Sequence, residues 1–326
     1  MEFRTRVESP CKVISLGYDD NMLLMGSCFA ENFGSFLAKS KFTCCTNPFG
    51  VLYNPLSVAE ALQQLYDGKQ YGIDDLFLDD NGIWHSWMHH SSFSSAHAED
   101  TLRLIRQHAG EADIYQRNVL IITFGTAWVY ERDGRIVGNC HKMPESTFTR
   151  RMLSTDEIVA RWEALPCLQQ GDTRVVFTVS PIRHQRDGFH ANQLSKATLL
   201  LAVEELVRRH SHCTYFPSYE ILMDELRDYR FYADDMLHPS SLAVQYVLER
   251  FQDTCLDTRA RQILAQWESI QKLLAHRPLN PQALSWKHFL GQTIQKLHHF
   301  HEEYPFIHVE NEINQCQELL NQSARR

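Results

Sequence analysis

A chain of 326 residues with 44% hydrophobic residues is long enough to bury a sizeable core, as one large domain or two smaller ones. Charged residues make up 22% of the sequence, the formal net charge is −8, and no run of lysine and arginine stands out. Nucleic-acid binding needs a clustered basic surface, so we expect no nucleic-acid partner. No stretch reaches the roughly 20 apolar residues that span a bilayer, so we expect no membrane span.

The cysteines and the first residues indicate a cytoplasmic location. Nine cysteines occur without a C-x-x-C pair or the spacing of a disulfide framework, and reduced thiols are the simplest interpretation. The opening residues MEFRTRVESP scatter charges and lack the apolar core of a secretory signal. We therefore expect a soluble, cytoplasmic protein.

Strands that alternate with helices are predicted over the first part of the chain. The run 118–124 (NVLIITF) is apolar on both faces and β-branched, as buried parallel strands are. In chain order the expected elements are a strand at 21–25, a helix at 29–40, a strand at 42–46, a helix at 57–66, a hairpin or loop at 74–95, a helix at 98–107, the strand at 118–124 and a hairpin turned at Asp133-Gly134.

The pattern continues to about residue 255 and then becomes helical throughout. The next elements are a helix at 154–165 opened by a capping box of Ser154 and Glu157, a strand at 174–179, a helix at 191–209, a strand at 215–216, and helices at 258–276, 281–301 and 309–321. Buried strands alternating with helices predict an α/β sheet covered on both faces. We therefore expect a sheet domain at 1–255 and a helical extension at 256–326.

The helical extension carries an apolar stripe of Trp286, Phe289, Leu290 and Leu297. The stripe could pack on the sheet domain or form a homodimer contact, and packing is the favoured interpretation.

Ser27 lies at the turn after the first predicted strand, in the string Gly26-Ser27-Cys28-Phe29-Ala30. In an open α/β sheet, sites form at the carboxyl ends of the strands. The N–H groups of the helix that starts here could stabilise an oxyanion. On this turn alone, however, helix capping is the more common use of a serine.

An acidic residue and a histidine follow late in the sheet domain. Asp235 and His238 are three residues apart, just before a helix that Ser240 or Ser241 could cap. Such a turn can place both side chains on one side, where the carboxylate orients the imidazole as a base. By itself the segment is more typical of a surface loop. Together with Ser27 it becomes a candidate catalytic triad.

Several strings in order resemble one family. Besides Gly26–Ala30, they are NPFG at 47–50, YNP at 53–55, FGTAWVY at 124–130 and SPIRH at 180–184. The chain from about residue 20 to 255 resembles the GSCFA family, a branch of the SGNH/GDSL-type hydrolases. The resemblance implies a flavodoxin-like, three-layer α/β/α fold. It also implies an esterase, acyl hydrolase or acyltransferase that needs no cofactor or metal and acts on a small-molecule or carbohydrate ester.

The same resemblance assigns roles to the triad and to an oxyanion hole. Ser27 is the nucleophile, His238 the base and then the acid, and Asp235 the orienting carboxylate. The superfamily's oxyanion hole uses the nucleophile's own N–H, a glycine N–H after the second strand and an asparagine side chain after the third. Ser27 and Gly50 match the first two.

The third oxyanion donor departs from the family pattern. Ala127 stands where the asparagine would be, and Thr126 is the nearest side chain that could replace it. Losing one donor typically costs about 100- to 1,000-fold in rate.

Substrate contacts are assigned to His184, Trp128 and Asn54, which lie in the strings of the resemblance. For His184, a satisfied loop histidine is the competing interpretation. The nearby His190, Asn192 and Lys196 are expected to have structural roles in the next helix.

Three alternatives compete with a serine hydrolase. Cys28 is intrinsically the better nucleophile, but its side chain should point into helix packing. A metal site is suggested by the histidines His85, His89, His90 and His97. No carboxylate or cysteine ligand completes the set, so a loop that flanks the cleft is the better interpretation. The third alternative is a non-catalytic carbohydrate- or acyl-binding module on the same fold, for which the missing asparagine is the best argument.

Overall fold

A computed structural model describes residues 4–8 and 14–324. The chain forms two compact units. The sheet unit comprises Met1–Ala38 and Thr43–Leu256, and the helical unit comprises Lys39–Phe42 and Asp257–Arg326. The short segment Lys39–Phe42 therefore belongs with the C-terminal helices, although it lies between two elements of the sheet unit.

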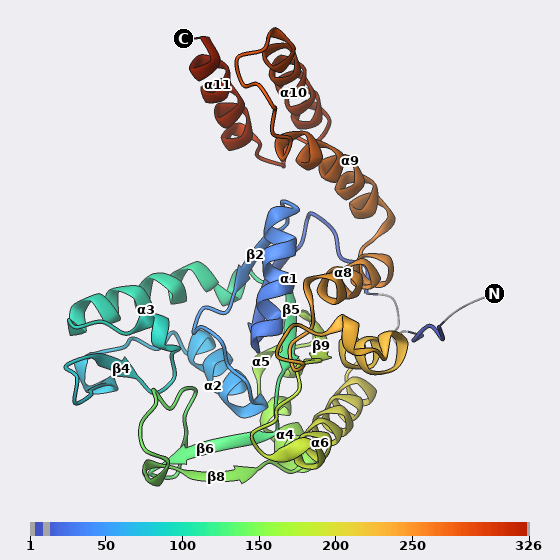
Figure 1. The fold of residues 1–326 in the computed structure, drawn as a ribbon. Helices are drawn as coiled ribbons and strands as arrows, with labels where there is room; N and C mark the ends of the chain where they lie inside the picture. The colour runs from blue at the N-terminus through green and yellow to red at the C-terminus, as the bar shows by residue number, and fades with distance from the viewer. Residues whose placement is uncertain (1–3, 9–13, 325–326) are drawn as a thin grey trace. The chain divides into compact units, whose positions relative to one another are not determined.

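Five parallel strands form the centre of the sheet unit (Figure 1). They are β1 (Asn21–Gly26), β2 (Thr43–Thr46), β5 (Val119–Phe124), β9 (Arg174–Val179) and β10 (Cys213–Phe216). Their order across the sheet is β10-β9-β5-β1-β2, and every neighbouring pair is parallel. This is the strand order of flavodoxin-like folds. The predicted α/β/α architecture is confirmed.

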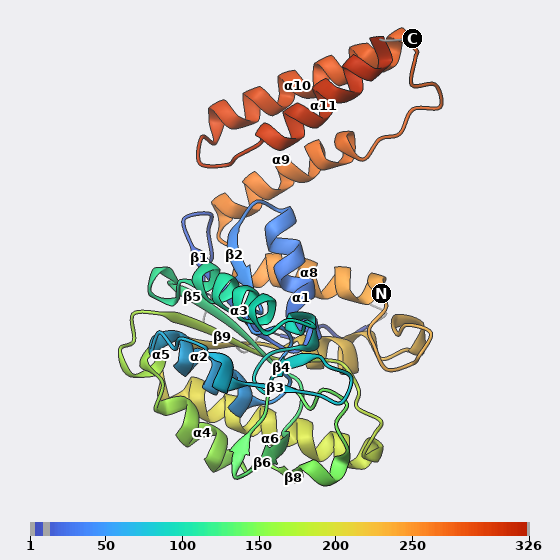
Figure 2. The ribbon, with the colours of Figure 1, turned by 90° about the vertical axis from the view of Figure 1, so that its left-hand side faces the viewer.

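Helices cover both faces of this sheet (Figure 2). One layer contains α1 (Cys28–Lys39) and α8 (Ser241–Cys255), and the other contains α2 (Pro55–Tyr66), α4 (Thr155–Glu163) and α6 (Gly188–Arg209). The layers form because strand side chains alternate between the two faces, and both faces are apolar.

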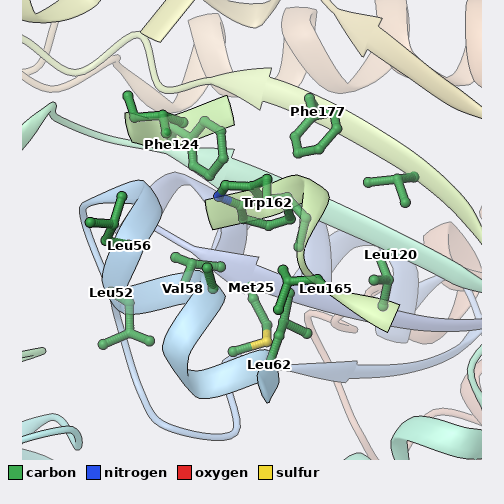
Figure 3. Packing of buried hydrophobic residues seen from close by; sticks show 14 of the residues in the cluster. Met25, Leu52, Leu56, Val58, Leu62, Leu120, Phe124, Trp162, Leu165 and Phe177 are labelled. Carbon is green, nitrogen blue, oxygen red and sulfur yellow. The ribbon is translucent and has the colours of Figure 1, made fainter. Parts of the chain in front are cut away.

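Aromatic rings fill the two layers. On the α2–α4–α6 side, Phe124 and Phe177 pack against Trp162, with ring centres 5.2 Å apart in each case (Figure 3). On the α1–α8 side, Phe33 of α1 meets Phe251 of α8 at 5.0 Å. Edge-to-face packing of this kind stabilises a core beyond the area it buries.

Smaller elements surround the main sheet. They are the hairpin β3 (Leu76–Leu78) and β4 (Trp84–Ser86), the antiparallel sheet of β6 (Trp128–Arg132), β7 (Arg135–Ile136) and β8 (Thr149–Met152), the helices α3 (Ala98–Ala112), α5 (Pro166–Gln169) and α7 (Ser218–Glu220), and a π-helical turn at Ile221–Leu226. The predicted hairpin at Asp133-Gly134 is confirmed, since β6 and β7 pair across it.

The sequence-based prediction missed β8, whose sequence TRRM has no apolar alternation. Its Arg151 forms ion pairs with Glu131 of β6 and with Glu157 of α4, at 2.8 and 2.6 Å. The predicted capping box is half present: the Ser154 hydroxyl accepts the Glu157 N–H at 3.2 Å, while the Glu157 carboxylate binds Arg151 instead.

The helical unit consists of α9 (Thr258–Leu274), α10 (Leu284–Glu303), α11 (Glu310–Ala324) and the segment Lys39–Phe42. Trp286, Leu290 and Leu297 of the predicted stripe are buried. Trp267 packs on Phe300, and its indole N–H donates to the Lys39 carbonyl at 2.8 Å. A homodimer contact through this unit stays a prediction. Within the described residues, no helix is both long and apolar enough to cross a membrane.

Candidate active site

Loops that follow β1, β5 and β9 line one cavity of about 680 Å³. β1 and β5 are neighbours, and the chain leaves them towards opposite edges of the sheet, because β2 lies beyond β1 and β9 beyond β5. At such a switch point the loops diverge and leave a crevice at the carboxyl ends of the strands. The volume is within the roughly 300 to 1,000 Å³ of small-molecule sites. Two members of the candidate triad, Ser27 and His238, line this cavity.

Ser27 lies where β1 passes into α1. Gly26 has a φ of +136°, and a Cβ there would lie 2.0 Å from the Thr123 carbonyl oxygen, so only glycine fits between β1 and β5. The Asn47 side chain, after β2, accepts the Gly26 N–H at 2.9 Å. The ends of three strands therefore fix this turn. Ser27 is 1% exposed, and its Oγ accepts the Phe29 N–H at 3.3 Å, so it also caps α1.

The side chains of Asp235 and His238 are hydrogen-bonded to each other. His238 Nδ1 lies 2.5 Å from Asp235 Oδ2, and Asp235 Oδ1 accepts the N–H groups of Leu237 and His238, both at 2.9 Å. The backbone N–H groups of His238 and Leu237, and then the imidazole, lower the pKa of Asp235 to about 2. The charged carboxylate holds the imidazole in one orientation, as the acid of a triad does.

The turn that carries His238 is tied to the loop after β9. The Arg183 N–H donates to the Leu237 carbonyl at 3.2 Å, and its guanidinium donates to the Met236 carbonyl at 3.3 Å. Leu237 and His238 line the same cavity as Ser27. In the described part of the chain no hydrogen bond joins the Ser27 hydroxyl to His238. Catalytic hydrogen bonds often tighten only when a substrate binds.

The two amides predicted to form an oxyanion hole have partners of their own. The Ser27 N–H donates to the Thr123 carbonyl at 3.0 Å, and the Gly50 N–H donates to the Asn47 carbonyl at 2.7 Å. Gly50 is also not among the described residues that line the cavity. To act as oxyanion donors, both N–H groups would have to give up these backbone hydrogen bonds. The two assignments stay predictions.

Thr126 lies on the cavity wall, within a network of its own loop. Its hydroxyl is 3.1 Å from Ser195 Oγ and accepts the Trp128 N–H at 3.2 Å. Ser195 Oγ also accepts the Ala127 N–H at 2.8 Å. The Thr126 hydroxyl is thus engaged, and its role as the third donor stays a prediction.

All three predicted substrate contacts, His184, Trp128 and Asn54, line the cavity. Among the described residues, His184 Nε2 and Trp128 Nε1 are buried without a hydrogen-bond partner. Leaving such atoms unpaired is costly, and a polar ligand could satisfy both. Burial, and then the charge of Lys196, lower the pKa of His184 to about 4, so its ring is neutral at pH 7.

Asn54 differs from the other two because its side chain is used within the protein. It caps α2, with Oδ1 accepting the Ser57 N–H and Nδ2 donating to the Ser57 hydroxyl, both at 2.8 Å. The side chain of Asn54 therefore holds the start of α2.

Paired charges and aromatic rings form the outer wall of the cavity. The Arg150 guanidinium lies 4.1 Å from the centre of the Trp128 ring and makes two hydrogen bonds to Asp187, at 2.7 and 2.5 Å. Arg186 pairs with Glu145. Lys142 and Arg183 also line the cavity and have no carboxylate partner among the described residues, so the wall is aromatic, polar and net positive.

Cys28 also lines the cavity, beside Ser27. Burial, and then the charge of Glu31, raise the pKa of its thiol. A protonated thiol is a poor nucleophile, so the geometry favours Ser27 over Cys28.

The histidine-rich segment is held by local hydrogen bonds. His85 Nδ1 lies 2.6 Å from Ser94 Oγ, and His89 Nδ1 lies 2.9 Å from Ser86 Oγ. Over residues 4–8 and 14–324, no group of three or more His, Cys, Asp or Glu residues could hold a metal ion.

A larger cavity of about 880 Å³ lies beside α2. Three ion pairs lie on its wall, Arg161 with Glu60 at 3.2 Å, Lys69 with Asp75 at 3.0 Å and Arg132 with Asp133 at 3.6 Å. No histidine is among the described residues that line it. Size alone therefore does not make it the candidate active site.

Sequence reasoning gave Lys196 a structural role in the next helix, but it missed that this lysine is buried. It lies on α6, is 1% exposed, and donates to the Gly125 carbonyl at 2.7 Å and the Ser180 carbonyl at 2.6 Å. It thus joins the loops after β5 and β9 beneath the cavity. Its place in an otherwise amphipathic helix carried no signal of burial, because lysine is rarely buried.

Comparison with known proteins gives a family. The model of the GSCFA family matches residues 21–251, and the model of the GSCFA domain protein, C-terminal domain, matches residues 267–322. No curated protein matches the chain. The first match covers the sheet unit from β1 into α8, and the second covers most of the three C-terminal helices.

Proposed function

The chain belongs to the GSCFA family, and we propose that it is a serine hydrolase of the SGNH/GDSL type that cleaves or transfers an ester-linked acyl group. The observation that carries the proposal is one cavity at the switch point of the sheet, lined by Ser27 and by a His238 that is hydrogen-bonded to Asp235. Resemblance to the superfamily supports the reaction type.

In the proposed reaction His238 Nε2 takes the proton of Ser27 Oγ while that oxygen attacks the carbonyl carbon of the ester. The tetrahedral intermediate collapses, the bond to the alcohol oxygen breaks, and His238 gives its proton to that oxygen. Water then attacks the acyl-enzyme, His238 takes a proton from the water, and Ser27 recovers its proton as the acid leaves. Asp235 keeps its charge and holds the imidazole throughout.

The oxyanion is proposed to bind at the starts of two helices. The N–H groups of Cys28, at the start of α1, and Asn54, at the N-cap of α2, donate to no other described residue. Both residues line the cavity with Ser27. Unpaired amides at helix N-termini favour negative charge, so they suit an oxyanion better than the engaged amides of Ser27 and Gly50.

The substrate is proposed to be an amphipathic ester, such as an acylated carbohydrate. The aromatic rings around Trp128 support this class, and the buried nitrogens Trp128 Nε1 and His184 Nε2 offer contacts to hydroxyl groups.

A serine-directed fluorophosphonate tests the proposal. We expect one covalent adduct per chain, at Ser27, located by mass spectrometry of proteolytic peptides. Ser27→Ala should abolish the adduct, and Cys28→Ala should keep it, because the raised pKa leaves that thiol protonated. A folded wild-type protein that stays unlabelled, or an adduct that moves with Cys28, would contradict the proposal. The first outcome would favour the acyl- or carbohydrate-binding module.

A further inference from the structure

Lys196 is a buried cation without a carboxylate partner in the described part of the chain. Its two acceptors are the carbonyl oxygens of Gly125 and Ser180. Removing an ammonium group from water is costly unless charge or hydrogen bonds compensate, and two carbonyls compensate only in part. The fold thus keeps a positive charge next to the cavity, bonded to the carbonyl of the cavity-lining Ser180, although its burial is energetically costly. The proposed reaction develops negative charge within that cavity.

A chain of peptide groups leads from this lysine to the cavity. The Gly125 carbonyl belongs to the same peptide group as the Thr126 N–H, which donates to the Tyr53 carbonyl at 3.0 Å. The Tyr53 carbonyl in turn belongs to the same peptide group as the Asn54 N–H. That last N–H has no partner among the described residues, and Asn54 lines the cavity.

We propose that Lys196 is a positioning residue whose charge polarises these two peptide groups and strengthens the Asn54 N–H as an oxyanion donor. The proposal rests on the hydrolase function proposed above. Hydrogen-bonded chains reinforce one another, because each bond made to a carbonyl makes the N–H of the same peptide group a stronger donor. A cation at one end therefore raises the donor strength at the other. In this way the protein compensates for the asparagine donor that Ala127 does not supply.

The same peptide chain touches the nucleophile. A Cβ built on Gly125 would lie 3.2 Å from Ser27 Cβ and 3.0 Å from the Tyr53 carbonyl oxygen. Gly125 therefore packs closely against both residues, and Lys196 holds the carbonyl of this shared neighbour. Errors of about 1 Å in such positions can cost on the order of 100-fold in rate.

Lys196 changes charge close to neutral pH. Burial lowers its pKa to about 7. The titratable groups around it are Cys28 of α1, His184 of the loop after β9 and Tyr219 of α7, whose ring centre is 5.7 Å from Nζ. The pKa values of Cys28 and Tyr219 are raised and that of His184 is lowered, so all three are neutral at pH 7. Lys196 is the member of this group that titrates there.

The test compares Lys196→Met with wild type on p-nitrophenyl acetate. We expect kcat to fall roughly 10- to 100-fold with KM changed less than about 2-fold, because the polarised donor acts on the transition state. In wild type kcat should show an alkaline limb near pH 7 as Lys196 loses its proton. That limb should be absent from Lys196→Met, and Lys196→Arg, which stays charged, should recover part of kcat and also lack the limb.

Ser195→Ala is the matched control. It removes a buried polar contact to the same loop, through Ala127 and Thr126, but leaves the charge, so it should keep the alkaline limb. An unchanged kcat and pH profile in a Lys196→Met protein that still labels at Ser27 overturns the inference. If that variant does not fold, Lys196→Gln takes its place in the same comparison. Failure of the wild type to label at Ser27 instead defeats the hydrolase proposal itself.

Discussion

Asp235 is half exposed, yet three hydrogen bonds converge on its carboxylate. They lower its pKa to about 2, below the ordinary 3.8. Because the folded-state pKa is depressed, the stability from these bonds is present above about pH 4 and is lost as pH falls towards 2. The carboxylate thus stays charged over the pH range in which an imidazole titrates, and it can orient His238 throughout that range.

Asp235→Asn should lower kcat by roughly 1,000- to 10,000-fold with little change in KM. An amide can still accept the two backbone N–H groups, but its uncharged oxygen no longer stabilises the imidazolium, and its NH₂ favours the wrong tautomer. The matched control is Asp234→Asn, which changes an exposed neighbour. The measurement is steady-state hydrolysis of p-nitrophenyl acetate by both variants, and equal losses in the two would remove Asp235 from the mechanism.

At the scale of single residues, the candidate catalytic side chains could be predicted from the sequence. The backbone N–H groups of Cys28 and Asn54, now proposed as oxyanion donors, could not. The combination of Ser27 with Asp235 and His238, together with the family resemblance, singled out these residues, and the structure brings Ser27 and His238 to one cavity. The Asn54 N–H is a property of local conformation and of missing partners, which residue type does not encode. Lys196 could not be singled out either, because its burial depends on loops that are distant in the chain.

Among the elements, the turns after the strands position the site, and the strands themselves were the most predictable part. β5 and β9 are apolar on both faces, which is the pattern of a covered parallel strand, and the prediction placed both within one residue. β8 was missed because ion pairs of Arg151 hold it, rather than apolar alternation. The turn at Gly26 was recognised by its sequence, but its tight contact with β5 is visible only in three dimensions.

Gly26→Ala should destabilise the fold by roughly 3 kcal/mol or more, because its Cβ would overlap the Thr123 carbonyl and its φ is positive. The control is Gly134→Ala at the β6–β7 hairpin, where φ is +73° but no atom lies within 4 Å of the added Cβ. Only backbone strain of about 1 to 2 kcal/mol is expected there. Urea denaturation of both variants measures the difference, and similar losses would mean that the close approach at Gly26 does not matter.

At the scale of the whole molecule, the helical unit includes a short segment from the first part of the chain, Lys39–Phe42. The Lys39 carbonyl accepts from Trp267 Nε1 and from Gln271 Nε2, both at 2.8 Å, and Lys41 pairs with Glu312 at 2.7 Å. Lys39 is also the last residue of α1, the helix that begins beside Ser27. The sequence predicted the C-terminal helices from their periodicity, but this long-range pairing has no local signal.

A chain that ends at Leu256 should keep phosphonate labelling at Ser27 but unfold at a lower temperature, by roughly 5 °C. The reason is that Lys39 and Lys41 lose the three partners supplied by the C-terminal helices, at a net cost of about 0.5 to 1 kcal/mol each. Calorimetry compares the truncated chain with a full-length Lys41→Ala control, which loses only the ion pair. An unchanged melting temperature after truncation would contradict the stabilising role of this pairing.

The order of the candidate catalytic residues along the chain has a consequence for how activity arises. Ser27 precedes every strand but β1, whereas Asp235 and His238 follow the last strand, β10. A growing polypeptide carries the nucleophile long before its base has been synthesised, and the whole sheet must assemble before both line one cavity. Under the proposed mechanism, chains that end before His238 and misfolded chains do not react with a phosphonate. Each covalent adduct then reports one molecule whose sheet has assembled, so the labelling reaction also measures assembly.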